Sequence, residues 1–318
     1  SDPRMLWQTL ISGQPWVIPP FLLILALFYY TNAQRWSWTL SRFGRFSPRQ
    51  LMPSMMIGFA ANNVLPLRVG ELIRAYLLAK DYRLPRSGIL MNLVLERLLD
   101  LIGILTVFVA GLLLVPDAPT AFRTSAWVAA AAVLSIAIAL SVLLLMPNTV
   151  NRLWLALGRP LPARLLERGS IYLAQFVIGL SPMRDPATAT LVLIQSIARW
   201  FLPVGLAWLS IHAYADSVSM PAAMITIGIT AFAVALPSAP GFVGPIQAAF
   251  VFALTPFGIS QEAALAASLL FLLGHWIPVT TTGALLLASR HRSFKEVAAE
   301  AENNASVEHD RERAGSAP

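Results

Sequence analysis

The sequence contains no cysteine among its 318 residues, and only 12% of them are charged. The lack of thiols excludes disulfides, iron–sulfur clusters, thiolate zinc sites and cysteine nucleophiles. Four histidines, scattered along the chain, leave little material for a histidine-based metal site. We therefore expect neither a metal nor a cofactor.

The scarcity of charge also excludes an ordinary soluble fold. A soluble domain is typically about 25% charged, whereas here hydrophobic residues make up 57% of the chain. A water-facing surface cannot be built from that supply, so most of the surface must face lipid. We predict an all-α polytopic membrane protein.

The net charge of +7 is unevenly placed. Residues 296–318 carry six acids against two arginines, which leaves 21 basic and 10 acidic residues in 1–295, a balance of +11. In a membrane protein such an excess is typical of cytoplasmic loops and of contact with anionic head groups. We expect membrane lipids as partners, with an anionic head group, and no nucleic acid.

Five segments are apolar over the length of about 20 residues that a bilayer requires. The first is not a cleaved signal peptide, because it has no strong basic leader and no small-residue cleavage site. Between the third and the fourth, residues 147–185 carry five arginines among leucines and aromatics, which favours a helical cytoplasmic connector on the membrane surface. The tail, 296–318, lacks an apolar face and is predicted to be disordered. The five predicted spans are 16–33, 88–115, 124–146, 187–213 and 262–289.

Two further apolar stretches, 52–80 and 220–254, are each split by a Pro/Gly-rich break. Each half has about 10–17 residues, or roughly 15–25 Å of helix, which is too short to cross alone. We therefore predict two re-entrant helical hairpins within one transmembrane domain, residues 1–295. The predicted turn residues are Pro66, Gly70, Pro237, Pro240, Gly241 and Gly244.

The two stretches also resemble one another weakly. The pattern Met-Pro-x-x-Met occurs at residues 52–56 and again at 220–224. Interrupted hydrophobic segments in both halves of a chain indicate the binding site of a transporter.

Charge placement favours hairpins that turn back over segments that cross. In that topology Arg35, Arg42, Arg45 and Arg49, which follow the first span, lie on the same side as the basic residues of 80–86, of 147–185 and of 290–295. The loops of the opposite side then hold one basic residue. This is the positive-inside pattern, and it places the C-terminus in the cytoplasm.

Three spans separate the hairpins, so the hairpins enter from opposite faces, which is the inverted arrangement of many transporters. The same count places the N-terminus outside. We expect a further span before the first of these 318 residues.

Seven charged residues lie at membrane depth in this topology. An ionisable group near the bilayer centre costs about 2.5–3.5 kcal/mol on insertion scales, so it is expected to face the protein interior with a partner or a function. Glu96 and Asp100 share a helix face, and Arg97 lies about 100° around it. The set has one surplus positive charge, which suits a lipid phosphate. The seven are Arg68, Glu71, Arg74, Glu96, Arg97, Asp100 and Arg199.

A structural role for these charges is the alternative. They can pair with one another and fix the first hairpin to span 88–115. Binding is favoured for Arg68 and Glu71, because they lie in the break itself, where freed backbone N–H groups point into the cavity. For Glu96 and Asp100 the two interpretations are evenly balanced.

Three neutral residues complete the candidate substrate-binding site. Asn62 and Asn63 precede the first break, where they can cap the backbone or contact a ligand. Gln247 begins a half-helix of the second hairpin, as Glu71 does in the first.

The chain has no G-x-x-x-x-G-K-[ST], H-E-x-x-H or G-x-S-x-G motif, so we expect no ATPase, protease or hydrolase activity and name no catalytic residue.

Three motifs, in this order, resemble the lysylphosphatidylglycerol synthase transmembrane-region family of flippase-like proteins, which includes the membrane half of multiple peptide resistance factors. The resemblance covers about residues 6–290. It implies a multi-pass protein of the bacterial inner membrane that moves lipids or lipid-linked molecules between leaflets. It also implies one more span at the start. The motifs are Asn62-Asn63-x-Leu65-Pro66-x-Arg68-x-Gly70-Glu71-x-x-Arg74, Glu96-Arg97-x-x-Asp100 and Pro237-x-x-Pro240-Gly241-x-x-Gly244.

Two departures from the family limit what the resemblance implies. The aminoacyl-transfer domain of the full synthases has no counterpart here, so we do not expect lipid lysylation. Relatives often have an acid where this chain has Gln247, which argues against proton coupling there.

The leading hypothesis is a flippase for a phospholipid or a lipid-linked anionic molecule. In this hypothesis the two hairpins meet near the membrane midplane and form a polar cavity that contains the charged residues. The alternatives are an intramembrane enzyme on a lipid-linked substrate, with Glu71 or Glu96 as the base, and a structural membrane partner of a separate lipid synthase. The candidate protein partners are a second copy of the chain and such a synthase.

Overall fold

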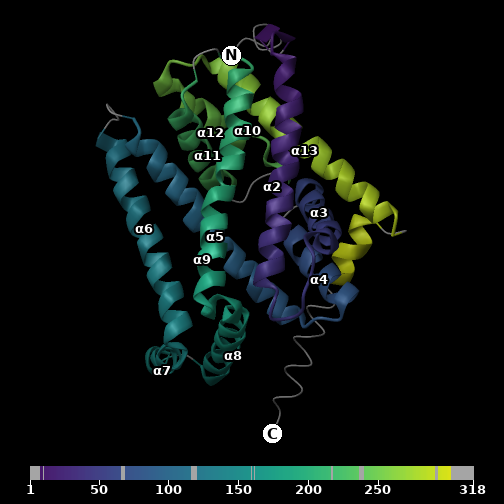
Figure 1. The fold of residues 1–318 in the computed structure, drawn as a ribbon, viewed down its shortest axis with the longest axis vertical. Coiled ribbons are helices and arrows are strands. Elements are labelled where there is room, and N and C mark those ends of the chain that lie inside the picture. Colours follow the sequence, from purple (N-terminus) through teal and green to yellow (C-terminus); the bar gives the residue numbers. More distant parts are fainter. Residues whose placement is uncertain are drawn as a thin grey trace.

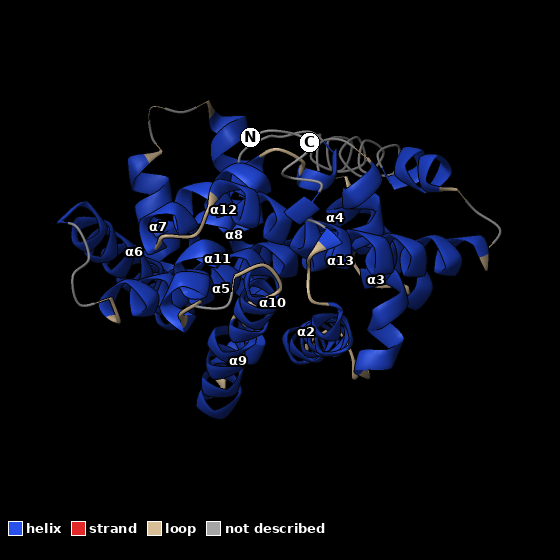
Figure 2. Ribbon diagram, turned by 90° about the horizontal axis from the view of Figure 1, so that it is seen from above, coloured by secondary structure: helices blue, strands red, loops and turns tan. Residues whose placement is uncertain are grey.

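The computed structural model describes residues 8–9, 11–65, 69–115, 120–158, 160, 162–215, 218–235, 240–290 and 293–301. Within these residues every regular element is a helix (Figure 2). The predicted all-α polytopic fold is therefore confirmed.

In the described part of the chain, four helical segments are long and apolar enough to cross a membrane: Pro15–Thr39, Trp127–Leu145, Pro186–His212 and Gln261–Ala288. The remaining predicted span, 88–115, forms one continuous helix, α5 (Arg86–Leu113), of 28 residues. At 1.5 Å per residue it is about 42 Å long, which exceeds the hydrocarbon thickness. Three charged residues near its middle interrupt its apolar run. The helices of the four apolar segments are η1 (Pro15–Val17) with α2 (Ile18–Thr39), α6 (Thr120–Leu145), α9 (Pro186–Arg199) with α10 (Phe201–His212), and α13 (Gln261–Ala288).

Each interrupted stretch forms two helices with a break between them. The first pair is α3 (Pro48–Val64) and α4 (Gly70–Tyr82), and the second is α11 (Met220–Ala235) and α12 (Pro245–Leu254), with a short 3-10 helix, η4 (Pro240–Phe242), between them. In Figure 1 the first pair lies in the lower half of the long axis and the second pair in the upper half. We call these pairs the first and the second hairpin.

Local chemistry sets the ends of α3. A capping box formed by Ser47 and Gln50, with Pro48 in the first turn, begins the helix. At the other end Leu65 is extended, with φ −97° and ψ 146°. Leu65 precedes a proline, whose ring disfavours helical geometry in the residue before it. The predicted turn residues Pro66 and Pro237 lie outside the described residues.

The glycines of the two breaks serve different purposes. Gly241 has φ 75° and Gly244 has φ 99°, which is backbone that glycine adopts at little cost. Gly70 is required by close packing instead, since a Cβ atom there would lie 2.0 Å from the backbone oxygen of Gly58. In the first hairpin glycine thus allows the two helices to approach closely. In the second hairpin glycine allows the backbone to turn.

The two hairpins pack reciprocally on the long helices of the opposite half. Helix α3 packs on α13, which follows the second hairpin, and α11 packs on α5, which follows the first. A Cβ atom on Gly283 of α13 would lie 2.6 Å from the Met56 oxygen, and one on Gly111 of α5 would lie 2.8 Å from the Met224 Cβ. Met56 and Met224 are the matching methionines of the weak sequence repeat. The repeat therefore corresponds to equivalent packing positions.

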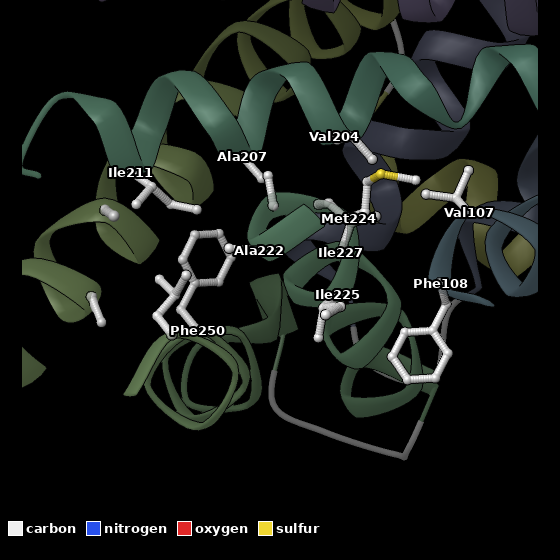
Figure 3. Close-up of a cluster of buried hydrophobic side chains, with 14 of the residues drawn as sticks. Val107, Phe108, Val204, Ala207, Ile211, Ala222, Met224, Ile225, Ile227 and Phe250 are labelled. Atoms are coloured by element: carbon white, nitrogen blue, oxygen red, sulfur yellow. The ribbon is translucent and has the colours of Figure 1, made fainter. Parts of the chain in front are cut away.

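The core around the second hairpin is built from small and branched side chains (Figure 3). Val204 and Ala207 of α10 lie against α11, and Phe250 of α12 lies beside them. Small residues at helix contacts let backbones approach closely, and van der Waals packing then supplies the association that lipid does not. Gly228 of α11 follows this rule, because a Cβ atom there would lie 2.3 Å from the Phe108 ring of α5.

Residues 147–185 form helices, as expected. Helix α7 (Pro147–Leu157) has no buried residue, and Figure 1 shows it nearly end-on, so it runs across the direction of the long helices. The Trp154 indole donates a hydrogen bond of 3.0 Å to the Leu166 oxygen of α8 (Ala163–Gly179), which ties the two helices together. The membrane-surface location of this connector stays a prediction.

Asp185 caps the next helix, α9. The Thr188 hydroxyl and backbone N–H both donate to its carboxylate, at 2.6 and 2.9 Å, and they hold the pKa of Asp185 below its usual range. A fixed charge at this N-terminus also complements the helix dipole.

The expectation of a disordered tail from residue 296 onward is wrong for its first residues. Residues 294–301 form a helix that begins with a Ser293–Glu296 capping box. Val297 and Ala301, four residues apart, are buried against α3 and α4. Glu300 pairs with Lys80 at 3.4 Å and accepts a hydrogen bond from the Tyr76 hydroxyl. The apolar face of this helix is narrow, and it is flanked by the acids Glu296 and Glu300, which have partners of their own. The hydrophobic pattern therefore does not show it. Residues 302–318 lie outside the described residues.

Candidate functional site

Four helices bring charged residues together beside the first hairpin. Helix α2 supplies one of these residues, α4 supplies two, α5 supplies three and α9 supplies one. Six of the seven belong to the predicted set, and Arg68 lies outside the described residues. The ion cluster consists of Arg35, Glu71, Arg74, Glu96, Arg97, Asp100 and Arg199.

The centre of the ion cluster is a bidentate pair between α4 and α5. Arg74 Nη1 and Nη2 lie 3.1 and 2.7 Å from Glu96 Oε1 and Oε2. Both residues are buried, with 2% and 5% of their surface exposed. The guanidinium also stacks 3.7 Å from the Trp36 ring centroid, a cation–π contact. This pair fixes the first hairpin to α5, as the structural interpretation predicts.

Asp100, one turn further along α5, holds two more arginines. Arg35 Nη1 lies 2.7 Å from Asp100 Oδ1, and Arg35 Nη2 lies 3.6 Å from Glu96, so Arg35 bridges the two acids. Arg199 of α9 also pairs with Asp100, and its other terminal nitrogen donates a hydrogen bond of 2.6 Å to Asn32. The buried acids thus each serve more than one arginine.

Sequence reasoning placed Arg35 in a loop, and that placement is wrong. Helix α2 continues to Thr39, and Arg35 is only 1% exposed. The signal for this lies in the spacing of buried polar residues, since Asn32, Arg35 and Thr39 follow one another at intervals of three and four and share a helix face. A span that ends at residue 33 hides this face.

The ion cluster reaches the surface at one edge. The Arg97 side chain is 44% exposed and the Glu71 side chain 29%, and Arg97 Nη2 lies 3.3 Å from Glu71 Oε1. A second terminal nitrogen of Arg97 lies 3.8 Å from Asp100. Arg97 stands near the middle of α5, and Glu71 opens the first turn of α4. This edge joins the first hairpin to the long helix that follows it.

The three neutral candidates lie elsewhere. The Asn63 amide donates to Thr280 at 2.9 Å, toward α13, while Asn62 lies beside Gly70. The Gln247 side chain accepts a hydrogen bond of 2.7 Å from the Gly244 N–H and caps α12. None of the three contacts the ion cluster in the described part of the chain.

The hairpins meet, but they do not share a polar chamber. Helix α3 contacts η4, and the Trp276 indole donates to the Asn63 oxygen at 3.4 Å beside this contact. The described residues of the second hairpin include no charge. The expectation that both hairpins enclose the charged residues is therefore wrong. The second hairpin borders an apolar cavity instead.

That cavity has a volume of about 230 Å³ and lies between α2, α10, α11, η4 and α13. Phe28 and Trp200 line it, and the Arg199 guanidinium lies 5.1 and 5.5 Å from the centroids of these two rings. The same two aromatic side chains thus line the cavity and lie near Arg199 of the ion cluster. Among the described residues no group of three or more histidines and acids could hold a metal ion.

These features define a multi-pass helical membrane protein with two interrupted helix pairs and a buried ion cluster. The lysylphosphatidylglycerol synthase TM region family matches residues 1–283, which is most of the chain. The chain therefore belongs to this family, and the family predicted from the sequence is confirmed. No curated protein and no solved structure matches the chain.

Proposed function

We propose that this protein is a lipid flippase, which moves a phospholipid or a lipid-linked anionic molecule between the two leaflets of the membrane. Family membership supports a protein connected with lipid synthesis or lipid movement. The ion cluster supports the second of these, because it holds one arginine, Arg97, at an exposed edge where a head group can reach it.

The observation that carries the proposal is the half-exposed Arg97 near the middle of a membrane-length helix. A guanidinium at this depth is costly unless it faces water or an anion. The described cluster holds four arginines against three acids, so one positive charge is not neutralised from within. A phosphate group satisfies both the charge and the paired donors of an arginine.

The cluster divides into a frame and a contact edge. Arg35, Arg74 and Arg199 are buried and hold Glu96 and Asp100, which fixes α2, α4, α5 and α9 together. Arg97 and Glu71 form the exposed edge. A phosphate on Arg97 competes with Glu71 of the first hairpin, so head-group binding and hairpin position are coupled.

Glu96 is poorly suited to be the base of an intramembrane enzyme. Its two oxygens accept from Arg74, and Arg35 lies within ion-pair distance of one of them. Both oxygens are therefore occupied by arginine donors and are not free to take a proton from a substrate. The enzyme alternative would produce a covalent change in the lipid, which mass spectrometry of the vesicle lipids detects.

Arg97→Gln is expected to slow leaflet exchange about 10-fold or more, because it removes a charge-assisted contact to the phosphate. The measurement uses the full chain in vesicles with fluorescently labelled phosphatidylglycerol. A membrane-impermeant quencher then reports the labelled lipid in the outer leaflet over time.

The matched control is Arg290→Gln. Arg290 pairs with Asp81 at 2.9 Å outside the ion cluster, so this variant loses a surface charge of the same kind. Unchanged exchange in the folded Arg97 variant would remove the ion cluster from transport. An absence of exchange in the wild type, together with co-purification of a separate synthase, would favour a structural role.

We further infer that the protein lies in the bacterial inner membrane, with a cytoplasmic C-terminus and with its hairpins entering from opposite faces. The cysteine-free sequence permits single-cysteine labelling without background. Cysteines within 81–86 and 290–295 should react with an impermeant reagent from the cytoplasmic face only. Those within 216–219 and 257–261 should react only from the other face. Labelling of 81–86 and 290–295 from opposite faces would refute the re-entrant second hairpin, because that hairpin and four spans lie between these two segments.

A further inference from the structure

Thr230 of α11 is a polar side chain without a partner in the lining of the apolar cavity. It is 6% exposed, and its hydroxyl makes no hydrogen bond within the described part of the chain. Its neighbour one turn earlier, Thr226, donates to the Ala222 oxygen at 2.7 Å, as threonines inside helices commonly do. Thr230 therefore differs from the ordinary buried threonine of the same helix.

The other polar groups of the lining are occupied or lie away from the cavity. The Asn63 amide donates to Thr280, the Trp276 indole donates to Asn63, and His275 is held by the Tyr29 hydroxyl at 2.8 Å. The Trp200 indole nitrogen is also without a hydrogen bond among the described residues, but it faces α5, 3.0 Å from where a Cβ atom on Gly103 would lie. Of the two described lining side chains that have a buried polar atom without a hydrogen bond, Trp200 and Thr230, Thr230 is therefore the one left for a ligand. A buried hydroxyl without a partner is costly, so a ligand with an acceptor is favoured there.

The shape and chemistry of the cavity restrict this ligand. Its lining is mostly aliphatic and aromatic, and about 230 Å³ is less than a whole drug-sized molecule occupies. The occupant must have an apolar body and an acceptor near it, and it must be present inside a membrane. The ester-linked segment of an acyl chain has these properties, because its carbonyl oxygen accepts and it offers no donor of its own.

We propose that the cavity binds the acyl-ester segment of a membrane phospholipid and that Thr230 donates a hydrogen bond to an ester carbonyl. This deepens the proposed function, on which it rests for the identity of the ligand as a lipid. Arg199 of the ion cluster lies near Phe28 and Trp200, which line the cavity. Head group and acyl ester would thus be recognised by separate halves of the protein, the first hairpin for one and the second for the other.

The test compares two lipids that differ only in this acceptor. The full chain is freed of surface lipid by detergent exchange and then incubated with equal amounts of diacyl phosphatidylglycerol and its dialkyl ether analogue. Native mass spectrometry counts the retained lipid. The wild type is expected to prefer the diacyl form about fivefold, which is the ratio that one net hydrogen bond gives.

Thr230→Val is expected to abolish this preference while keeping the side-chain volume. Thr226→Val, on the same helix, is the matched control and should keep it. Ala231→Phe fills the cavity and should reduce retention of both lipids. Equal binding of the two lipids by the wild type, a preference that persists in Thr230→Val, or full retention by Ala231→Phe would each overturn the proposal.

This readout is independent of transport. Arg97→Gln should slow leaflet exchange and keep the preference for diacyl lipid, since Arg97 does not line the cavity. A wild type that exchanges lipid but shows no ester preference would refute the acyl site alone. A wild type that shows the preference but moves no lipid would refute the flippase and leave the site in place.

Discussion

Glu96→Gln is expected to lower the free energy of unfolding by about 3–5 kcal/mol, the cost of removing one partner from a buried ion pair. The glutamine keeps the shape of the side chain but places an amide nitrogen among the donors of Arg74 and Arg35. Arg74 then loses the acid with which it pairs, and Arg35 loses one of its two, while Arg35 and Arg199 keep Asp100. Chemical unfolding in detergent, followed by circular dichroism in the aromatic region, measures the change.

Glu71→Gln is the control for this prediction. Its carboxylate faces Arg97 at the exposed edge of the ion cluster, where an ion pair contributes about 0–1 kcal/mol. The double variant Arg74→Gln/Glu96→Gln removes both charges of the central pair, so its loss should be smaller than the sum of the two single losses. Equal stability of Glu96→Gln and the wild type would show that the cluster does not hold the helices together.

The sequence was sufficient to find the acidic half of the ion cluster. Glu96 and Asp100 are four residues apart inside an apolar run, and charges in that position indicate an interior face whatever their partners are. Their partners could not be assigned in the same way. Arg35 and Arg199 come from helices that are distant in the chain, and only the packing of α2 and α9 on α5 brings them to Asp100.

The second hairpin shows a different limit. Its interrupted hydrophobic pattern and its turn glycines could be predicted from the sequence, because the positive φ of Gly241 and Gly244 is a conformation that glycine readily adopts. The sequence also shows that this hairpin has no charged residue, yet its likeness to the first hairpin suggested that the two share a polar chamber. The apolar cavity depends on Phe28 and Trp200, which only tertiary packing places beside η4.

The structure gives the weak sequence repeat a physical interpretation. Met56 and Met224 matched in a short pattern that chance alone could produce. Their partners Gly283 and Gly111 lie in the long helix of the opposite half, so each methionine oxygen or side chain meets a glycine across a helix crossing. Both matched positions therefore lie at close helix crossings, which only the packing of the two halves shows.

Gly70→Ala is expected to destabilise the protein by about 3 kcal/mol, the upper end of what overpacking costs. The new Cβ atom would lie 2.0 Å from the Gly58 backbone oxygen and 2.5 Å from the Asn62 side-chain oxygen. The Gly58 oxygen belongs to the backbone of α3 and cannot rotate away, so α4 must move off α3. That movement shifts Glu71 and Arg74, the next charged residues of α4, and leaflet exchange should fall with stability.

Gly205→Ala is the matched control for this change, because it also adds a methyl group to a glycine of a helix. Its Cβ atom would meet Ile24 at 3.5 Å, which is ordinary contact, and alanine favours helix over glycine by about 0.8–1.0 kcal/mol. We therefore expect Gly205→Ala to be neutral or slightly stabilising in the same unfolding measurement. If Gly70→Ala were equally well tolerated, the close approach of α3 and α4 could not be what holds Glu71 and Arg74 against α5, and the coupling of head-group binding to the first hairpin would lose its physical basis.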